Sequence, residues 1–179
     1  MFNGIIKSTG TINKIFFQKK NCSIQVKSKI NFKKKEIGSS VSCSGTCLTL
    51  EKINKNLITF YLSHETINKT NFKNVKKGDT INMEKSMKYG ERISGHFVQG
   101  HVDTTSEVNN ISIIGKSWYI NFYLLKKYRQ YIAKKGSIAI NGVSLTISKV
   151  LKNGFQIVVI PQTLKLTNLM FLKKKDLVN

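Results

Sequence analysis

The chain has very little arginine, although it is strongly basic. Arg92 and Arg129 are its two arginines, so lysine supplies almost all of the formal net charge of +21. Base readout and bidentate phosphate contacts favour arginine, and no aromatic-basic motif of the RRM type is present. Scattered lysine on solvated surfaces is therefore the favoured interpretation, and we expect no nucleic-acid partner. A basic nucleic-acid-binding barrel would instead show salt-sensitive retention on DNA or RNA.

Cysteines are few, and no hydrophobic run is long. Cys22, Cys43 and Cys47 are odd in number and have no C-x-x-C spacing, which argues against a disulfide framework and against a zinc cluster. No apolar run is long enough to cross a bilayer, and the first four residues lack the basic-then-apolar order of a secretory signal. We therefore expect no metal, no membrane partner and a cytoplasmic location.

The most informative feature that is present is an internal repeat. Residues 45–82 recur at residues 142–179 with a constant offset and no gap. The matching pairs include Gly45/Gly142, Leu48/Leu145, Thr49/Thr146, Asn71/Asn168 and Asn82/Asn179. Self-similarity of this length predicts two copies of one folded unit, which we divide into residues 1–92 and 93–179. A ligand site in one copy should have a related site in the other.

Short apolar runs separated by Gly, Asn and Lys predict many short strands. In the second copy, residues 143–150 and 155–160 flank Asn153-Gly154, a dipeptide typical of a type I′ hairpin turn. Residues 46–53 and 57–62 repeat the pattern in the first copy. We expect the inner face of each hairpin to carry Leu together with Thr or Ser.

Helical turns are expected at three places in the chain. Residues 65–72 and 162–169 each place a Thr near the start and a Thr-Asn pair four residues later, which is typical of a capped turn. Apolar residues at helical spacing within residues 124–132 predict a surface helix. Many antiparallel strands with few helices favour small closed barrels, because closure removes exposed sheet edges. The fold prediction is all-β (mainly β), with two such barrels in tandem.

The densest polar segment is residues 95–103, Gly-His-Phe-Val-Gln-Gly-His-Val-Asp. A metal site is not expected there, because His96 and His101 are an odd number of residues apart and would point to opposite faces of a strand. A histidine near a ligand can transfer protons near neutral pH. We interpret His101 as functional and His96 as a structural, hydrogen-bonded residue.

Four motifs, in the same order along the chain, resemble those of riboflavin synthase. They are residues 1–6, 44–49, 95–103 and 141–146. The resemblance runs from the first residue to the last and implies two six-stranded antiparallel barrels, each binding one 6,7-dimethyl-8-ribityllumazine. It further implies transfer of a four-carbon unit between the two molecules, which yields riboflavin and 5-amino-6-ribitylaminouracil without a cofactor or a metal.

The resemblance also implies a homotrimer whose working site forms where the N-terminal barrel of one subunit meets the C-terminal barrel of the next. Carried over to this sequence, the substrate site of the first barrel consists of Gly4, Ile5, Ile6, Cys47, Leu48, Thr49, Tyr61, Leu62, Ser63, His64, Glu65 and Thr66. That of the second barrel consists of Gly100, His101, Val102, Lys135, Ser144, Leu145, Thr146, Val158, Val159, Ile160, Pro161, Gln162 and Thr163. Backbone amides would pair with the uracil-like edge of the ring, and hydroxyl, Glu and Gln side chains would bind the ribityl chain.

The implied chemistry needs a base that takes a proton from the C7 methyl of one lumazine. The residues expected to handle protons are His101, Ser144 and Thr146. Cys47 and Ser40 would face the partner ring, with Phe2 covering it. Two alternatives stay open at this point: Cys47 as a small buried residue and Lys135 as a solvated lysine.

The sequence departs from the family pattern in two places. The second copy ends at Asn179, where the resemblance implies a further Glu, an Asp of the catalytic set and a C-terminal helix, so the sequence as given lacks the end of the last strand and the trimer-forming helix. Two alternatives stay open: a trimmed chain, which would leave the activity intact, and a shortened homologue, which would affect both the trimer and the acid-base partner. His64 replaces a proline usual in the family and matched by Pro161 in the second copy, which frees the backbone and is expected to weaken binding in the first barrel.

The main rival to an enzyme is a non-catalytic lumazine-binding or flavin-binding protein of the same fold. Such a carrier needs the barrels but not the groups that move protons. His101, Ser144, Thr146 and Cys47 are all present, and their presence together favours the enzyme.

Overall fold

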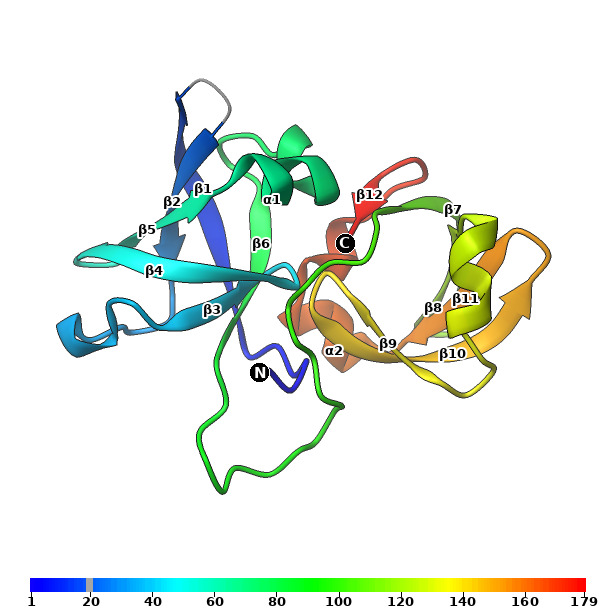
Figure 1. The fold of residues 1–179 in the computed structure, drawn as a ribbon. Coiled ribbons are helices and arrows are strands. Elements are labelled where there is room, and N and C mark those ends of the chain that lie inside the picture. Colours follow the sequence, from blue (N-terminus) through cyan, green and yellow to red (C-terminus); the bar gives the residue numbers. More distant parts are fainter. Residues whose placement is uncertain (19–20) are drawn as a thin grey trace.

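Two six-stranded sheets, one from each copy of the repeat, make up the computed structural model, which describes residues 1–18 and 21–179 (Figure 1). The first copy contains β1 (Ser8–Gln18), β2 (Asn21–Ser28), η1 (Lys34–Glu36), β3 (Ser40–Cys43), β4 (Thr46–Asn54), β5 (Leu57–Leu62), α1 (His64–Lys69), η2 (Asn71–Asn74) and β6 (Thr80–Lys85). The second contains β7 (Ser106–Ile114), β8 (Ser117–Tyr123), η3 (Lys126–Tyr131), β9 (Ser137–Ile140), β10 (Val143–Leu151), β11 (Gly154–Val159), α2 (Pro161–Leu166), η4 (Asn168–Phe171) and β12 (Leu177–Val178). The predicted mainly-β chain with two tandem antiparallel units is confirmed.

The two sheets share one strand order but differ in closure. The first is a closed barrel in the order β1-β2-β5-β4-β3-β6, because β6 pairs with both β1 and β3. The second runs β12-β7-β8-β11-β10-β9, and β12, with two residues against six in β6, pairs with β7. Asn179 holds the repeat position of Asn82, so residues 83–85, which include the partners of β3, have no counterpart in the chain. Asn141 N donates to Asn179 O at 3.0 Å across the gap, and the second sheet is curled rather than fully closed.

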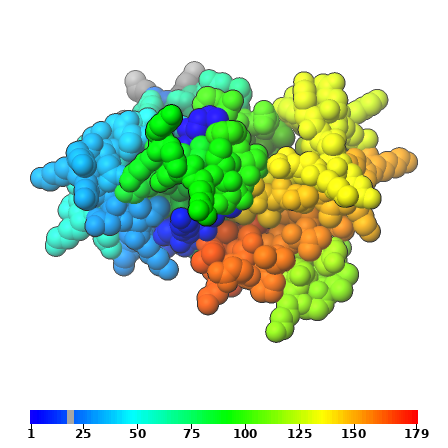
Figure 2. Space-filling model, turned by 90° about the horizontal axis from the view of Figure 1, so that it is seen from below, coloured from blue at the N-terminus to red at the C-terminus, as the bar shows by residue number. Residues whose placement is uncertain are grey.

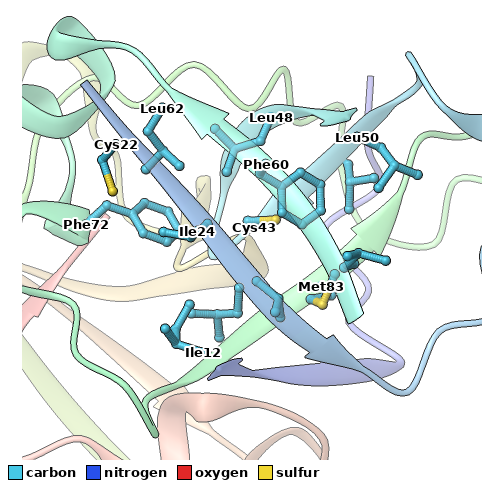
Figure 3. Close-up of a cluster of buried hydrophobic side chains, with 14 of the residues drawn as sticks. Ile12, Cys22, Ile24, Cys43, Leu48, Leu50, Phe60, Leu62, Phe72 and Met83 are labelled. Carbon is cyan, nitrogen blue, oxygen red and sulfur yellow. The ribbon is translucent and has the colours of Figure 1, made fainter. Parts of the chain in front are cut away.

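Alternation along the strands places apolar side chains inside each sheet. In β2, Ile24 and Val26 are fully buried between partly exposed neighbours. Figure 3 shows the first core, where Phe60 lies among side chains from several strands. In the second core the rings of Phe122 and Phe155 stack with their centroids 5.3 Å apart. Each fully buried side chain of this size contributes about 1.5–3 kcal/mol relative to an exposed one.

The two copies meet around a pseudo-two-fold axis. Gly45 and Gly142 hold the same repeat position, and a Cβ added to either would lie 2.7 Å from the backbone nitrogen of the other. This close contact needs glycine on both sides. In Figure 2 the dark-blue N-terminal residues are visible at the seam, between the green linker and the orange second copy.

Asparagine side chains join the copies reciprocally. The Oδ1 atom of Asn82, in the first copy, accepts from Asn168 N at 2.7 Å, and that of Asn179, in the second, accepts from Asn71 N at 2.7 Å. Asn82 also donates through Nδ2 to Asn141 O at 2.9 Å. The repeated Asn positions of the sequence therefore form the polar contact between the copies.

One predicted turn is wrong. Leu151 pairs with Gly154, so the turn of the second hairpin consists of Lys152 and Asn153, and neither Asn153 nor Gly154 has a positive φ. A type I′ turn needs positive φ at both central residues. A Cβ on Gly154 would overlap the carbonyl oxygen of Phe122, so this glycine permits close approach of β8 instead.

The predicted capped turns are confirmed. Thr70 Oγ1 accepts from Phe72 N and Thr167 Oγ1 accepts from Leu169 N, each at 3.3 Å. The surface helix predicted within residues 124–132 is a short 3₁₀ helix without buried residues. No helix in the described part of the chain has the length and apolar character needed to cross a membrane.

Candidate functional site

Each copy sends a short segment across to the other copy. Gly4 O accepts a hydrogen bond from Ser144 N at 2.8 Å, and Gly100 O accepts one from Cys47 N at 2.7 Å. Ser144 and Cys47 hold the same repeat position, near the starts of β10 and β4. Ile6 accordingly lies in the core of the second copy rather than the first.

These contacts correct the predicted grouping of the site residues. Residues 4–6 lie with residues 144–146, and residues 100–102 lie with residues 47–49, so the two segments are exchanged relative to the expectation. We call residues 47–49 and 100–102 the first half-pocket, and residues 144–146 and 4–6 the second half-pocket.

Both crossing segments depend on a glycine. Gly4 has φ +73 and Gly100 has φ +84, which only glycine adopts without strain. A Cβ on Gly4 would lie 2.7 Å from Ser144 Cβ, and one on Gly100 would lie 2.7 Å from Cys47 Cβ. The segments also pair with each other, because Phe2 N donates to Val98 O at 2.8 Å and Val98 N donates back at 3.0 Å. The Phe2 side chain is fully buried there.

The predicted polar side chains lie on the outer faces of the sheets. Along β4, Cys47 and Thr49 alternate with the buried Leu48. Along β10, Ser144 and Thr146 are likewise partly or fully exposed. The expectation that Leu and Thr share an inner face holds in β4, where Thr46 is buried on the same face as Leu48 and Leu50. The predicted site residues Cys47, Thr49, Ser144 and Thr146 lie on the opposite face, because successive strand residues alternate between faces.

The segments that follow β5 and β11 extend the half-pockets. Since β5 runs antiparallel to β4, its end lies beside the start of β4, where Cys47 lies. Ser63 Oγ caps α1 by accepting from Thr66 N at 3.2 Å. Tyr61, near the end of β5, is 42% exposed, and Ile160, directly after β11, is 55% exposed. Residues 61–66 and 158–163 thus have the equivalent locations that the repeat predicted.

His96, which its sequence context predicted to be structural, contacts a predicted site residue. Its Nδ1 lies 2.7 Å from Ser144 Oγ. Burial lowers the pKa of the His96 imidazole below its ordinary value of 6.5, so the ring is neutral at pH 7. A neutral imidazole can accept the Ser144 proton through Nδ1. The sequence offered one signal for His96, its place in the densest polar motif, but nothing in it indicated the partner.

His101 lies in the first half-pocket, directly after Gly100. Its side chain is exposed, and no hydrogen bond among the described residues joins it to Ser144 or Thr146. The predicted proton-handling set of His101, Ser144 and Thr146 is therefore divided between the two half-pockets of one chain.

The three thiols differ in environment. Cys22 and Cys43 are buried in the first core, where desolvation raises the pKa of each thiol. Cys47 is half-buried and follows Thr46 at the start of β4. Among residues 1–18 and 21–179, no group of three His, Cys, Asp or Glu side chains could hold a metal ion.

Lys135 has an unusual backbone conformation. Its φ is +68, and its exposed side chain projects from the turn before β9. Lys135 N donates to Ile147 O at 2.8 Å, which places the turn next to Thr146 on β10. The first copy has Gly38, with φ +90, at this repeat position. Lys175, with φ +76 at the repeat position of Gly78, has the same conformation, so the backbone does not distinguish Lys135 as functional, and its role in the site stays a prediction.

Two cavities adjoin the half-pockets. One of about 730 Å³ is lined by His96, His101 and Tyr128, among others, along the open edge of the second sheet. The other, of about 710 Å³, includes Ser40, which pairs with Thr49, and Glu84. Either is large enough for a small heterocyclic ligand.

Comparison with known families gives the same two units. The family described as Lumazine binding domain matches residues 3–86 and again residues 99–179. A riboflavin synthase of Buchnera aphidicola subsp. Schizaphis graminum is 38% identical over 182 residues, which cover 100% of this chain and 87% of that protein. A riboflavin synthase of Bacillus subtilis is 33% identical over 167 residues, which cover 93% of this chain and 78% of that protein.

Solved structures share the fold. The crystal structure of LumP complexed with riboflavin has a TM-score of 0.89 at 24% identity. The structure of LumP complexed with flavin mononucleotide has a TM-score of 0.86 at 26% identity. Each comparison covers 100% of this chain and 97% of the other.

Proposed function

The chain belongs to the riboflavin synthase family, and on that premise we propose that it converts two molecules of 6,7-dimethyl-8-ribityllumazine into riboflavin and 5-amino-6-ribitylaminouracil. A four-carbon unit passes from one lumazine to the other, without a cofactor. The observation that carries the proposal is the duplicated half-pocket, in which Gly4 meets Ser144 and Gly100 meets Cys47 in the same way. Two related sites suit a reaction between two identical molecules.

Each half-pocket would bind one lumazine with backbone and hydroxyl groups. Amides and carbonyls on the strand edges suit the uracil-like edge of the ring, and Thr hydroxyls with Glu65 or Gln162 suit the ribityl chain. The first half-pocket would use residues 61–66 in addition to its own, and the second would use residues 158–163 and Lys135.

The second half-pocket is the better place for proton removal. Ser144, hydrogen-bonded to the neutral His96 at 2.7 Å, can relay a proton from the C7 methyl to the imidazole. A general base of this kind contributes about 10²–10⁴-fold to the rate. Cys47 and Ser40 would face the second ring, and His101 would serve the first half-pocket. Holding the two rings together supplies much of the remaining acceleration.

We propose a cytoplasmic homotrimer as the working form. Both half-pockets open on outer faces of the sheets, with exposed Thr49 and Thr146, so a neighbouring subunit could bring a first half-pocket against a second one. The division into residues 1–92 and 93–179 would then give each subunit one half-site of each kind. Light scattering of the purified protein should give three times the mass of the chain, and a monomer that turns over substrate would contradict this arrangement.

The activity is tested by incubating the purified protein with 6,7-dimethyl-8-ribityllumazine alone. We expect riboflavin to appear, identified by its fluorescence and retention time, with two lumazines consumed for each riboflavin formed. The LumP structures with bound riboflavin and flavin mononucleotide support a second candidate, a carrier of the same fold. Tight binding without turnover would favour the carrier and refute the enzyme.

A further inference from the structure

One carboxylate of the first barrel holds the backbone of the second half-pocket. Glu84, in β6, is half-buried and uses both of its oxygens on one short segment. Oε1 accepts from Asn3 N at 2.8 Å, and Oε2 accepts from Gly4 N at 3.0 Å. Glu84 is not among the residues that the sequence placed in the site, although Gly4, which it holds, is one of them.

The segment that Glu84 holds makes the contacts of the proton-handling pair. Gly4 O accepts from Ser144 N at 2.8 Å, and Asn3 O accepts from His96 N at 3.2 Å. Asn3 Oδ1 also accepts from Gly95 N at 2.8 Å. The backbone of residues 3–4 is therefore fixed on one side by Glu84 and on the other by Ser144, Gly95 and His96.

The chemistry of this contact requires an ionised carboxylate. Both amides donate, so both partner atoms must accept, and charge-assisted hydrogen bonds of this kind are stronger than neutral ones. Burial raises the pKa of Glu84 above its ordinary value, and the hydrogen bonds from the amides of Asn3, Gly4 and Ile5 offset this only in part. A glutamine would turn an amide N–H toward a backbone N–H and lose one of the two contacts.

We propose that Glu84 is a positioning residue for the second half-pocket, acting through residues 3–4 to set the place of Ser144 and His96. This inference rests on the proposed function for its catalytic consequence. Through Glu84, the first barrel then contributes to the geometry of the site on the second sheet.

The first test is amide hydrogen exchange by NMR on the full chain, which needs no ligand. In Glu84→Gln we expect the amides of Gly4 and Ser144 to exchange at least about tenfold faster, because their shared segment is released. Core amides such as that of Ile157 should be unchanged. Glu107→Gln, at an exposed position of β7, is the matched control and should leave all of these amides as in the wild type.

The second test is a double-mutant cycle on lumazine turnover with Glu84→Gln and Ser144→Ala. If Glu84 acts through Ser144, the double variant should be no slower than Ser144→Ala within about threefold, whereas independent effects would multiply. Glu84→Asp keeps the charge but is one methylene shorter, and it replaces Glu84→Gln in both tests should that variant fail to fold.

Each outcome has a distinct meaning. Unchanged exchange at Ser144, or multiplicative losses in the cycle, would overturn the role of Glu84. A wild-type protein without turnover would refute the proposed enzyme. The hydrogen exchange of the Ser144 amide would still test the positioning role of Glu84, because that measurement does not depend on turnover.

Discussion

Ser144 and Cys47 hold one position of the repeat but have different neighbours. Ser144 has the His96 imidazole 2.7 Å away, and Cys47 has the glycine segment around Gly100. The hydroxyl and the neutral imidazole together can move a proton, which makes the two half-pockets chemically unequal. Two identical substrates need such a difference, since one must lose a proton and the other must be attacked.

His96 gives the protein a pH dependence whose sign follows from its lowered pKa. The unfolded chain takes up a proton near pH 6.5, before the folded protein does, so the contribution of His96 to stability is fully present above pH 6.5 and is lost as pH falls toward the folded pKa. We expect His96→Gln to remove this dependence. Urea unfolding from pH 7.5 to pH 5 measures it as a shrinking difference in unfolding free energy between wild type and variant; parallel curves would show that His96 does not titrate in this way.

The strands are joined at the site by segments that depend on glycine. Gly100 combines a positive φ with a contact that leaves no room for a Cβ beside Cys47. Gly115, in the turn between β7 and β8, has φ +60 but open space around it. Substitutions at these two glycines therefore distinguish the cost of backbone strain, which both share, from the cost of close packing, which only Gly100 has.

Gly100→Ala should damage the first half-pocket, whereas Gly115→Ala should cost only the strain. A non-glycine residue in the left-handed region costs about 1–2 kcal/mol, and Gly100→Ala must also displace the Cys47 strand. We expect lumazine affinity, measured by fluorescence titration, to fall about tenfold or more for Gly100→Ala at one of two sites and to stay unchanged for Gly115→Ala. Equal effects of the two substitutions would show that the close contact is unimportant.

The whole molecule is held together by reciprocal polar contacts between its copies. Asn82 is completely buried, yet its amide donates to Asn141 and to Asn168 and accepts from Asn168 N. Buried amides that are fully hydrogen-bonded specify one arrangement, because any displacement leaves unsatisfied groups. The relative position of the half-pockets depends on this contact.

Asn82→Ala should destabilise the protein by about 2–4 kcal/mol, since it leaves Asn168 N and Asn141 O buried without a partner. Asn109→Ala, at an exposed position of β7, should change the unfolding free energy by less than about 0.5 kcal/mol. Chemical denaturation of both variants measures the difference. A cost as small for Asn82 as for Asn109 would mean that the copies are held mainly by apolar contacts.

Much of the architecture was predictable from local patterns. The repeat predicted two related units, and alternation located the hairpins of β4 with β5 and β10 with β11. Capped turns within residues 65–72 and 162–169 were predictable because capping joins residues that are close along the chain, although only the structure shows that Thr70 and Thr167 provide the caps. The turn at Asn153 was missed because close approach of β8 at Gly154, not local turn chemistry, selects the glycine.

The site was less predictable. The motifs containing Cys47 and Ser144 were found, but the exchange of residues 4–6 and 100–102 between the copies was not, because repeat similarity does not indicate which copy a preceding segment packs against. His96 and Glu84 were missed for the same reason. Their partners lie 48 and 81 residues away along the chain.

Family membership, the duplicated unit and the strand positions could be read from the order of residues, because motifs, periodicity and repeats are properties of neighbours along the chain. Which segment completes which half-pocket, the neutral state of His96 and the reach of Glu84 came from the folded molecule alone. Those features arise from desolvation and hydrogen bonds between residues that are adjacent only after the two copies have packed together.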